Sequence, residues 1–117
     1  MKIGAIMMQI KQWDIWWASV RFDDVDEIKQ RPVIVLSSGE ILVIALKVTS
    51  QPPRVGDYVL SQWQYAGLYK PSTARLDKLL KLEHQEMKYR MGSLHPSDIL
   101  PIQKALADMT KVRSWNT

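Results

Sequence analysis

Apolar and polar residues alternate along this chain in short blocks, and the blocks predict mainly β-strands. The first apolar block, residues 14–20 (DIWWASV), is rich in aromatic and β-branched residues, as strands are. Pro32 opens the next apolar run, residues 33–36, and residues 41–48 (ILVIALKV) form a third. Proline suits the first residue of a strand because that position need not donate to the ladder. Short links join the three runs, so we expect an antiparallel meander.

The polar segments between these runs predict the connections. Residues 21–30 are charged and predict a long exposed hairpin loop, while residues 37–40 (SSGE) predict a turn. The segment 49–57 (TSQPPRVGD) contains two prolines and a glycine and predicts a structured, non-repetitive link. Residues 63–68 predict a turn or a single helical turn. Polar side chains are therefore expected beside the strand ends.

The second half of the chain predicts shorter strands and one clear helix. Further strands are expected at residues 58–60, 73–76 and, after a kink, 78–82. In residues 97–109 apolar side chains recur every three or four positions, which indicates an amphipathic helix that begins near Pro96 or Ser97. Residues 83–90 predict a shorter helix. The sum is a small, strongly curved antiparallel sheet or half-open barrel, with the terminal helix covering one side.

Composition limits the class of protein. The 117 residues suit one domain, and 46% apolar with 24% charged residues is typical of a globular chain. Without cysteine the chain has no disulfide, thiolate metal site or cysteine nucleophile, and it suits a reducing cytoplasm. The net charge of +4 favours a polyanionic partner such as nucleic acid. No apolar run reaches the ~20 residues of a membrane span.

The sequence predicts neither a metal site nor a cofactor. His84 and His95 have no carboxylate or second histidine at a spacing that suits a metal. The start of the chain has only a short apolar stretch and no small-residue cleavage site, which is too little for a secretory signal. We divide the chain into a flexible leader (1–11), a domain (12–110) and a tail (111–117).

Three polar clusters interrupt the apolar scaffold: Lys29 with Arg31, residues 47–54 (KVTSQPPR) and residues 70–78 (KPSTARLDK). Each cluster lies at a strand end or in the loop beside one. Because several strand ends meet at one edge of a meander, we expect the clusters to converge on a common rim.

Two of the clusters admit more than one interpretation. Arg75 and Asp77 are two residues apart and share a face of a regular strand, while Leu76 points into the core. They form either a surface ion pair of little worth or an arginine held by a carboxylate and directed at a phosphate, which arginine binds in bidentate fashion. Thr49 and Ser50 carry hydroxyls that either cap backbone groups or bind a ligand.

The aromatic residues also divide into two groups. Trp63 and Tyr65 lie near the third cluster and are candidates for stacking on nucleic-acid bases. Of Trp16 and Trp17, one is expected to point into the core and one outward, since neighbouring strand residues face opposite ways. The chain has no phosphate-binding glycine loop, dinucleotide fingerprint or Ser-His-Asp order. The pattern alone therefore indicates a small basic β-rich domain with a candidate phosphate site.

An ordered set of segments adds a family resemblance. The set comprises 14-DIWWASV-20, 31-RPVIVLS-37, 45-ALKVTSQPPR-54, 66-AGLYKPSTARLDKLLKL-82 and 92-GSLHPSDI-99. In order and spacing it resembles the MazF/PemK toxin family, most closely the PemK-like branch, over residues 12–109. The resemblance implies an SH3-like small antiparallel barrel of roughly five to seven strands with a C-terminal α-helix, within the usual size of such sheets.

The resemblance also implies an activity and partners. Members of the family are cytoplasmic, ribosome-independent endoribonucleases that cut single-stranded RNA at short sequences, usually in mRNA. They work as homodimers without a metal or other cofactor, and a cognate antitoxin blocks the RNA groove. Contact with DNA would be only indirect, through the antitoxin. Cleavage would proceed by attack of the RNA 2′-OH, leaving a 2′,3′-cyclic phosphate and a 5′-OH.

Carried over residue by residue, the resemblance assigns catalytic roles to Arg31, Thr49, Arg75 and Asp77. Arg31 matches the family's arginine before proline, and Thr49 matches its hydroxyl residue, although a shift of one or two residues would place Lys47 or Ser50 there. The Arg-x-Asp pair matches the acid and base partners of another branch. That branch also uses a histidine in the first long loop, and residues 21–30 contain none, so the general base stays open.

The implied RNA-binding residues are Lys29, Lys47, Ser50, Arg54, Trp63, Lys70, Ser72 and Thr73. Cleavage specificity is expected to lie in the loops 21–30, 50–57 and 62–72. An alternative of a different class is a non-catalytic SH3-like module, an inactive toxin homologue that binds RNA or a protein through the same basic edge.

Overall fold

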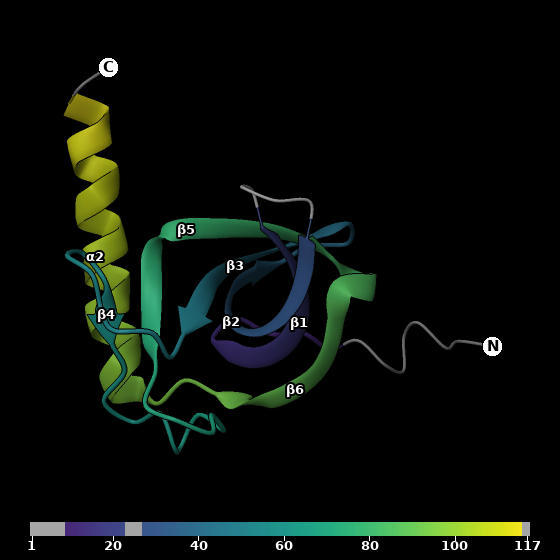
Figure 1. The fold of residues 1–117 in the computed structure, drawn as a ribbon. Coiled ribbons are helices and arrows are strands. Elements are labelled where there is room, and N and C mark those ends of the chain that lie inside the picture. The colour runs from purple at the N-terminus through teal and green to yellow at the C-terminus, as the bar shows by residue number, and fades with distance from the viewer. Residues whose placement is uncertain (1–8, 23–26, 116–117) are drawn as a thin grey trace.

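The computed structural model describes residues 9–22 and 27–115, which form an antiparallel sheet followed by one long helix (Figure 1). The elements are β1 (Asp14–Phe22), β2 (Glu27–Ser38), β3 (Leu42–Thr49), β4 (Tyr58–Val59), β5 (Thr73–Glu83), the 3₁₀ turn η1 (His84–Glu86), β6 (Met87–Ser93) and α2 (Pro96–Trp115). Parts of the predicted leader (1–8), hairpin loop (23–26) and tail (116–117) lie outside the described residues.

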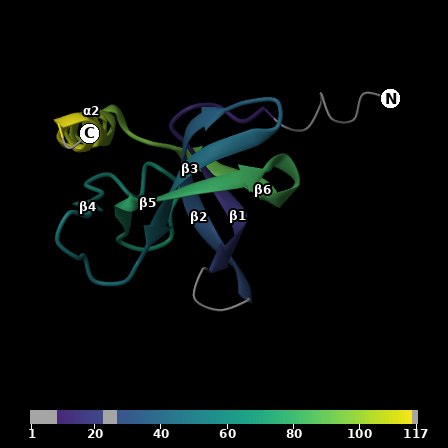
Figure 2. The ribbon, with the colours of Figure 1, turned by 90° about the horizontal axis from the view of Figure 1, so that it is seen from above.

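The strands form a six-stranded sheet in the order β4-β5-β3-β2-β1-β6. Strands β1, β2 and β3 are the predicted meander, and β6 returns across the molecule to pair with β1. The sheet curls strongly, with α2 standing against one side (Figures 1 and 2). The predicted mainly β fold with a C-terminal helix is therefore confirmed. The curl stops short of a closed barrel, since the edge strands β4 and β6 do not pair with each other within the described residues.

Strand β6 replaces the short helix predicted for residues 83–90, and that prediction is wrong. Only η1 is helical there, and the chain then extends along β1, with Tyr89 opposite Trp17. The segment is rich in charged residues that tolerate a helix, but the open edge of β1 offers backbone partners that a surface helix would leave unpaired. Pairing across the sheet thus overrides the local preference.

Pro32 lies inside β2 instead of opening it. The strand begins at Glu27, and Pro32 is opposite Trp17 of β1. On the other side of β2, pairing with β3 starts only at Val33. Pro32 therefore sits in a stretch with one open edge, where a missing N–H removes no ladder bond.

A register change bends β5 in the middle. Leu46 of β3 pairs with Leu79, whereas its neighbour Lys47 pairs with Arg75. One step along β3 thus corresponds to four along β5, and residues 76–78 bulge from the ladder, as bulges do where a strand changes direction. The predicted kink is confirmed, although the two strands predicted around it are one strand.

The sheet has a hydrophobic core on each face, because successive strand residues point in opposite directions. Ile34 and Leu46 belong to the core that packs against Ile102 of α2. Val33 and Ala45 belong to the other core, which also contains Ile10 and Trp16. The expectation for the tryptophan pair is confirmed, since Trp16 is buried and Trp17 is only half-buried.

Asp98, in the first turn of α2, fixes the helix to the chain around β4. The Asp98 carboxylate is fully buried and accepts hydrogen bonds from the Tyr58 hydroxyl at 2.6 Å, the Ser61 hydroxyl at 2.8 Å, and the backbone N–H groups of Ser61 at 3.0 Å and Gln62 at 2.9 Å. Burial alone raises the pKa of Asp98, but these hydrogen bonds outweigh it and leave the pKa lowered. Burial, together with the bond to Asp98, raises the pKa of Tyr58 to about 12.

Helix α2 runs to Trp115, beyond the 97–109 predicted from its apolar spacing. Among residues 96–109 of the helix, whose burial is described, the buried positions are Asp98 and Ile102. Within the described part of the chain, no helix combines the length and apolar character needed to cross a membrane.

Two glycines allow the turn at residues 63–68 to press against β6. A Cβ on Gly67 would lie 2.2 Å from the Met91 carbonyl oxygen, and one on Gly92 would lie 2.4 Å from the Ala66 carbonyl oxygen. Gly67 also has a φ of 89°, which disfavours other residues. The close contact holds the start of the 67–72 segment in place against the sheet.

We expect Gly67→Ala to lower the free energy of unfolding by about 3 kcal/mol, the sum of a left-handed backbone penalty and an overpacking penalty. Gly56→Ala is the matched control, since Gly56 has a φ of 91° but nothing lies within 4 Å of the position that a Cβ would take there. The control should lose only about 1 kcal/mol. Urea unfolding of both variants measures the difference, and equal losses would contradict the role assigned to the close contact.

Candidate functional site

A cavity of about 530 Å³ opens where β2, β3 and β5 meet the loops beside them. Its size is that of a pocket for a small ligand or part of a larger one. Its lining comprises Trp17, Arg31, Pro32, Lys47, Val48, Thr49, Ser50, Gln51, Leu68, Tyr69, Lys70, Ser72, Arg75 and Met91. These residues include four cationic side chains and no carboxylate, so the described surface of the cavity favours an anion.

Strand register brings three of the cations to one face of the sheet. Lys47 is directly opposite Val33 on β2 and Arg75 on β5, and opposed residues of antiparallel strands share a face. Arg31 lies two residues before Val33 and so has the same orientation. The cations therefore continue the face that carries the core of Val33 and Ala45, at the point where that core ends.

Arg31 lies on β2, where its cross-strand neighbour on β1 is a small residue. It lies opposite Ala18 of β1, which is fully buried. The Arg31 guanidinium donates a hydrogen bond from Nη1 to the Gln30 carbonyl oxygen at 2.9 Å. The following Pro32, with its restricted φ, stiffens the backbone that carries this side chain.

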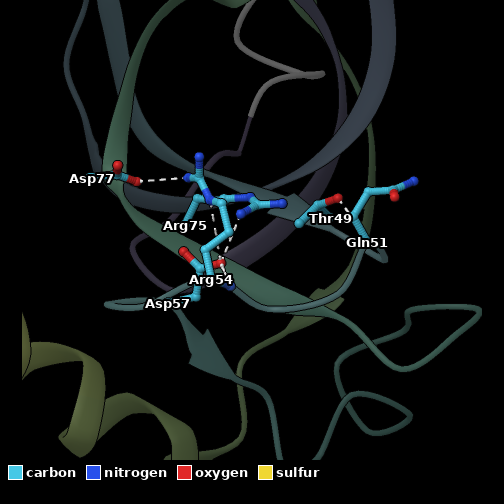
Figure 3. A network of polar contacts seen from close by, with 6 residues as sticks. All are labelled: Thr49, Gln51, Arg54, Asp57, Arg75 and Asp77. Atoms are coloured by element: carbon cyan, nitrogen blue, oxygen red, sulfur yellow. Dashed lines mark hydrogen bonds and ion pairs between the residues drawn. The ribbon is translucent and has the colours of Figure 1, made fainter.

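Asp57 is the buried partner of Arg75. The Arg75 guanidinium donates from Nη1 to Asp57 Oδ2 at 2.8 Å, and the exposed fractions of the two side chains are 10% and 2%. Asp57 Oδ2 also accepts the backbone N–H of Arg54 at 2.7 Å, which closes the turn around Gly56 (Figure 3). Charge-assisted hydrogen bonds of this kind fix the geometry of a guanidinium more firmly than neutral ones do.

Arg54 pairs with Asp77 on the exposed side of the same network. Arg54 Nη2 lies 3.3 Å from Asp77 Oδ1, and both side chains are more than half exposed. The Arg75–Asp77 pair expected from the sequence is therefore wrong, since each residue pairs with a different partner (Figure 3). The cause is the bulge at residues 76–78, which breaks the regular alternation of side chains and turns Asp77 away from Arg75.

The surroundings of Lys47 disfavour its charged form. Burial lowers the pKa of Lys47 below its ordinary value of 10.5. The surrounding positive charges lower it further, in the order Arg75, Arg31, Lys78 and Arg54. Both causes disfavour the ammonium form, since it is partly desolvated and repelled by like charges.

Trp17 and Tyr69 form an aromatic wall of the cavity, and Tyr89 extends this wall outside the lining. The rings of Trp17 and Tyr89 are stacked with centroids 6.3 Å apart, and Trp17 Nε1 donates to Gln30 Oε1 at 2.7 Å. A hydrogen bond with Tyr69 raises the pKa of Tyr89. Tyr69 and Tyr89 are exposed, so this wall offers flat aromatic surface next to the cations.

The structure gathers most of the residues predicted for the site and leaves some outside the cavity. The predicted residues that line it are Arg31, Lys47, Thr49, Ser50, Lys70, Ser72 and Arg75. Thr73 is buried opposite Thr49, and Arg54 and Asp77 lie behind Arg75 in its charge network. Lys29 is paired with Glu27 near the start of β2, and Trp63 packs against the core beneath α2. The catalytic and RNA-binding roles of all these residues stay predictions.

Two features of the site were not predicted. Asp57 follows a turn glycine in a segment interpreted only as a link, and its partner Arg75 is 18 residues away. The aromatic wall was expected from Trp63 and Tyr65, whereas Trp17 and Tyr69 line the cavity. The sequence did predict that one of Trp16 and Trp17 points outward, and that residue, Trp17, is part of this wall.

Among residues 9–22 and 27–115, no group of three or more His, Asp or Glu side chains is placed to hold a metal ion.

Comparison with protein families gives a match along most of the chain. The model for "PemK-like, MazF-like toxin of type II toxin-antitoxin system" matches residues 11–110. A search of curated protein sequences found no significant match.

Comparison with solved structures gives several similar folds. An endoribonuclease from Mycobacterial species has a TM-score of 0.68 at 14% identity, covering 88% of this chain and 92% of that one. The Mycobacterium tuberculosis toxin MazF-mt6 has a TM-score of 0.67 at 18% identity, covering 84% and 96%. A MazE-MazF crystal structure from Deinococcus radiodurans has a TM-score of 0.65 at 16% identity, covering 86% of this chain and 94% of that one. At these identities the similarity demonstrates a shared fold.

We expect Asp57→Ala to lower the free energy of unfolding by about 3 kcal/mol, because it leaves Arg75 buried without its counter-charge. Asp77→Ala breaks an exposed pair of the same network and should cost less than about 1 kcal/mol. Chemical denaturation of both variants tests the ranking. A larger loss for Asp77→Ala would show that the exposed pair, and not the buried one, holds the network.

Proposed function

This chain belongs to the family of PemK-like, MazF-like toxins of type II toxin–antitoxin systems, and from that premise we propose that it is a sequence-specific endoribonuclease that cleaves single-stranded RNA. The observation that carries the proposal is the cavity, where Arg31, Lys47 and Arg75 share one face with no carboxylate in the lining. A phosphodiester carries the charge that such a cavity favours, and arginine binds phosphate oxygens through paired donors.

In the proposed reaction the RNA 2′-OH attacks the adjacent phosphorus and leaves a 2′,3′-cyclic phosphate and a 5′-OH. Arg31 stabilises the charge that develops on the phosphoryl oxygens, which requires donors held in place beforehand. Thr49 donates a hydrogen bond to a non-bridging oxygen. Arg75 is a second clamp on the phosphate, and Asp57 takes the orienting role that the sequence had assigned to Asp77. The reaction uses no metal.

Recognition of the RNA is assigned to the aromatic wall beside the cations. Unpaired bases of single-stranded RNA stack on aromatic faces, and Trp17 and Tyr89 present such faces next to the cavity. Lys70 and Ser72, which also line the cavity, would contact the backbone on either side of the cleaved bond.

The protein partners and the cellular location are inferred from the family. A family defined by toxin–antitoxin systems and a similar MazE-MazF structure support a cognate antitoxin as partner. We propose that the antitoxin covers the cationic cavity, that the toxin acts as a homodimer, and that it works in the cytoplasm.

Arg31→Ala should lower kcat for RNA cleavage by about 10²–10³-fold, the effect of removing one pre-placed donor to a developing oxyanion. The assay uses a long single-stranded RNA with EDTA present and maps 5′-OH ends. Lys81→Ala is the control, since it removes an exposed cation of β5 outside the cavity. Wild-type rates in the Arg31 variant would remove this residue from the mechanism. Retarded but intact RNA with the wild-type protein would instead indicate a non-catalytic RNA-binding module.

Trp17→Ala should raise KM for RNA about tenfold with a smaller change in kcat, since one base–aromatic stack is worth roughly 1–3 kcal/mol. Trp17→Phe keeps a stacking face but loses the bond to Gln30, so its KM should lie between those of the other two proteins. Steady-state kinetics on a short RNA measures both. An unchanged KM in the alanine variant would place base recognition elsewhere.

A further inference from the structure

The proposed cleavage needs a group that gives a proton to the departing 5′-oxygen, and the cavity offers few candidates. The ionisable side chains in its lining are Arg31, Lys47, Tyr69, Lys70 and Arg75. Arginine keeps its proton at any working pH, so Arg31 and Arg75 are suited to binding charge and not to proton transfer. Arg75 is in addition held by Asp57 in a buried ion pair.

Of the two lysines in the lining, Lys47 is the one that lies on a strand, β3, beside the proposed phosphate-binding residues. It lies on β3, directly opposite Arg75 and on the same face as Arg31 and Thr49. Tyr69 and Lys70, in contrast, are exposed on the loop before β5. A proton donor must be within hydrogen-bond reach of the leaving oxygen, and a strand holds such a geometry better than a loop does.

The groups facing Lys47 make it a better acid than an ordinary lysine. Arg31 faces it from β2, Arg75 and Lys78 from β5, and Arg54 from the loop before β4. The carboxylates of the same network are Asp57, which contacts Arg75, and Asp77, which contacts Arg54. Burial and repulsion by these cations destabilise the ammonium form of Lys47 and so lower the pKa of Lys47.

We propose that Lys47 is the general acid of cleavage, an assignment that rests on the proposed endoribonuclease function. As the 2′-oxygen bonds to phosphorus, its proton leaves to solvent water. The P–O5′ bond breaks while an N–H bond of the Lys47 ammonium breaks and an O5′–H bond forms. Lys47 is left neutral and takes up a proton from solvent before the next turnover.

The test compares two RNA substrates that differ at one atom. One has the natural 5′-oxygen at the cleaved bond and the other has a bridging 5′-sulfur, whose thiolate leaves without a proton. Lys47→Ala should cut the oxygen substrate about 10²–10⁴-fold more slowly than the wild type, the usual worth of a general acid. On the sulfur substrate the same variant should come within about threefold of the wild type, because no general acid is required there.

Lys47→Arg separates proton donation from charge. It keeps a cation and a long side chain in the same place but does not release its proton, so it should be as slow on the oxygen substrate as Lys47→Ala. Lys81→Arg makes the same exchange on β5 outside the cavity and should leave both rates unchanged. Arg31→Ala should be slow on both substrates, because charge stabilisation is needed for either leaving group.

The pH profile gives an independent readout. A general acid works only while protonated, so the wild-type rate on the oxygen substrate should fall as pH rises through the pKa of Lys47, at a midpoint below 10.5. The sulfur substrate should lack that fall.

Cleavage of the oxygen substrate by Lys47→Arg at near wild-type rate would overturn the assignment and leave Lys47 as a phosphate contact. An equal loss by Lys47→Ala on both substrates would overturn it as well. A wild-type protein that cuts neither substrate would refute the endoribonuclease function itself, and this outcome is distinct because it appears before any variant is compared. Recovery on the sulfur substrate also shows that the variant is folded.

Discussion

Holding several positive charges together at the rim of a hydrophobic core is the constraint on which the rest of the structure depends. Arg31, Lys47 and Arg75 would repel one another if each were free to choose its position. The buried pair of Arg75 with Asp57 fixes one of them at 2.8 Å from a counter-charge that does not itself line the cavity. The cavity thus keeps its positive surface, while the Asp57 carboxylate, which lies outside the lining, offsets part of the repulsion among the cations.

The fold supplies this arrangement through strand register. The jump from the Leu46–Leu79 pair to the Lys47–Arg75 pair ends the apolar ladder and sets the cations opposite one another in a single step. Within the bulge, Asp77 lies at the surface, where it pairs with Arg54. A regular strand would have placed Asp77 on the face of Arg75, within reach of the phosphate site, and a carboxylate there would oppose binding of an anion.

Much of the fold follows from local pattern, and much of the site does not. The runs around Val33, Leu46 and Ile102 predict the meander and the helix because their spacing reflects which face is buried. The convergence of Arg31, Thr49 and Arg75 was predicted from strand ends that share an edge. Thr49 and Arg75 do lie near strand ends, whereas Arg31 lies inside β2. Their exact partners were not, because the bulge in β5 and the turn that carries Asp57 depend on contacts between distant segments. Strand β6 escaped prediction for the same reason, since only the open edge of β1 makes it a strand.

The anchor at Asp98 has a consequence for the order of folding. Its hydrogen-bond partners Tyr58, Ser61 and Gln62 lie 36 to 40 residues earlier in the chain. During synthesis those donors remain without their acceptor until the start of α2 has emerged, and contacts of such sequence separation form late. The segment that bears Asp57 is directly joined to Tyr58. Helix α2, made last, therefore completes the support of a cavity whose lining comes from the strands and loops before it.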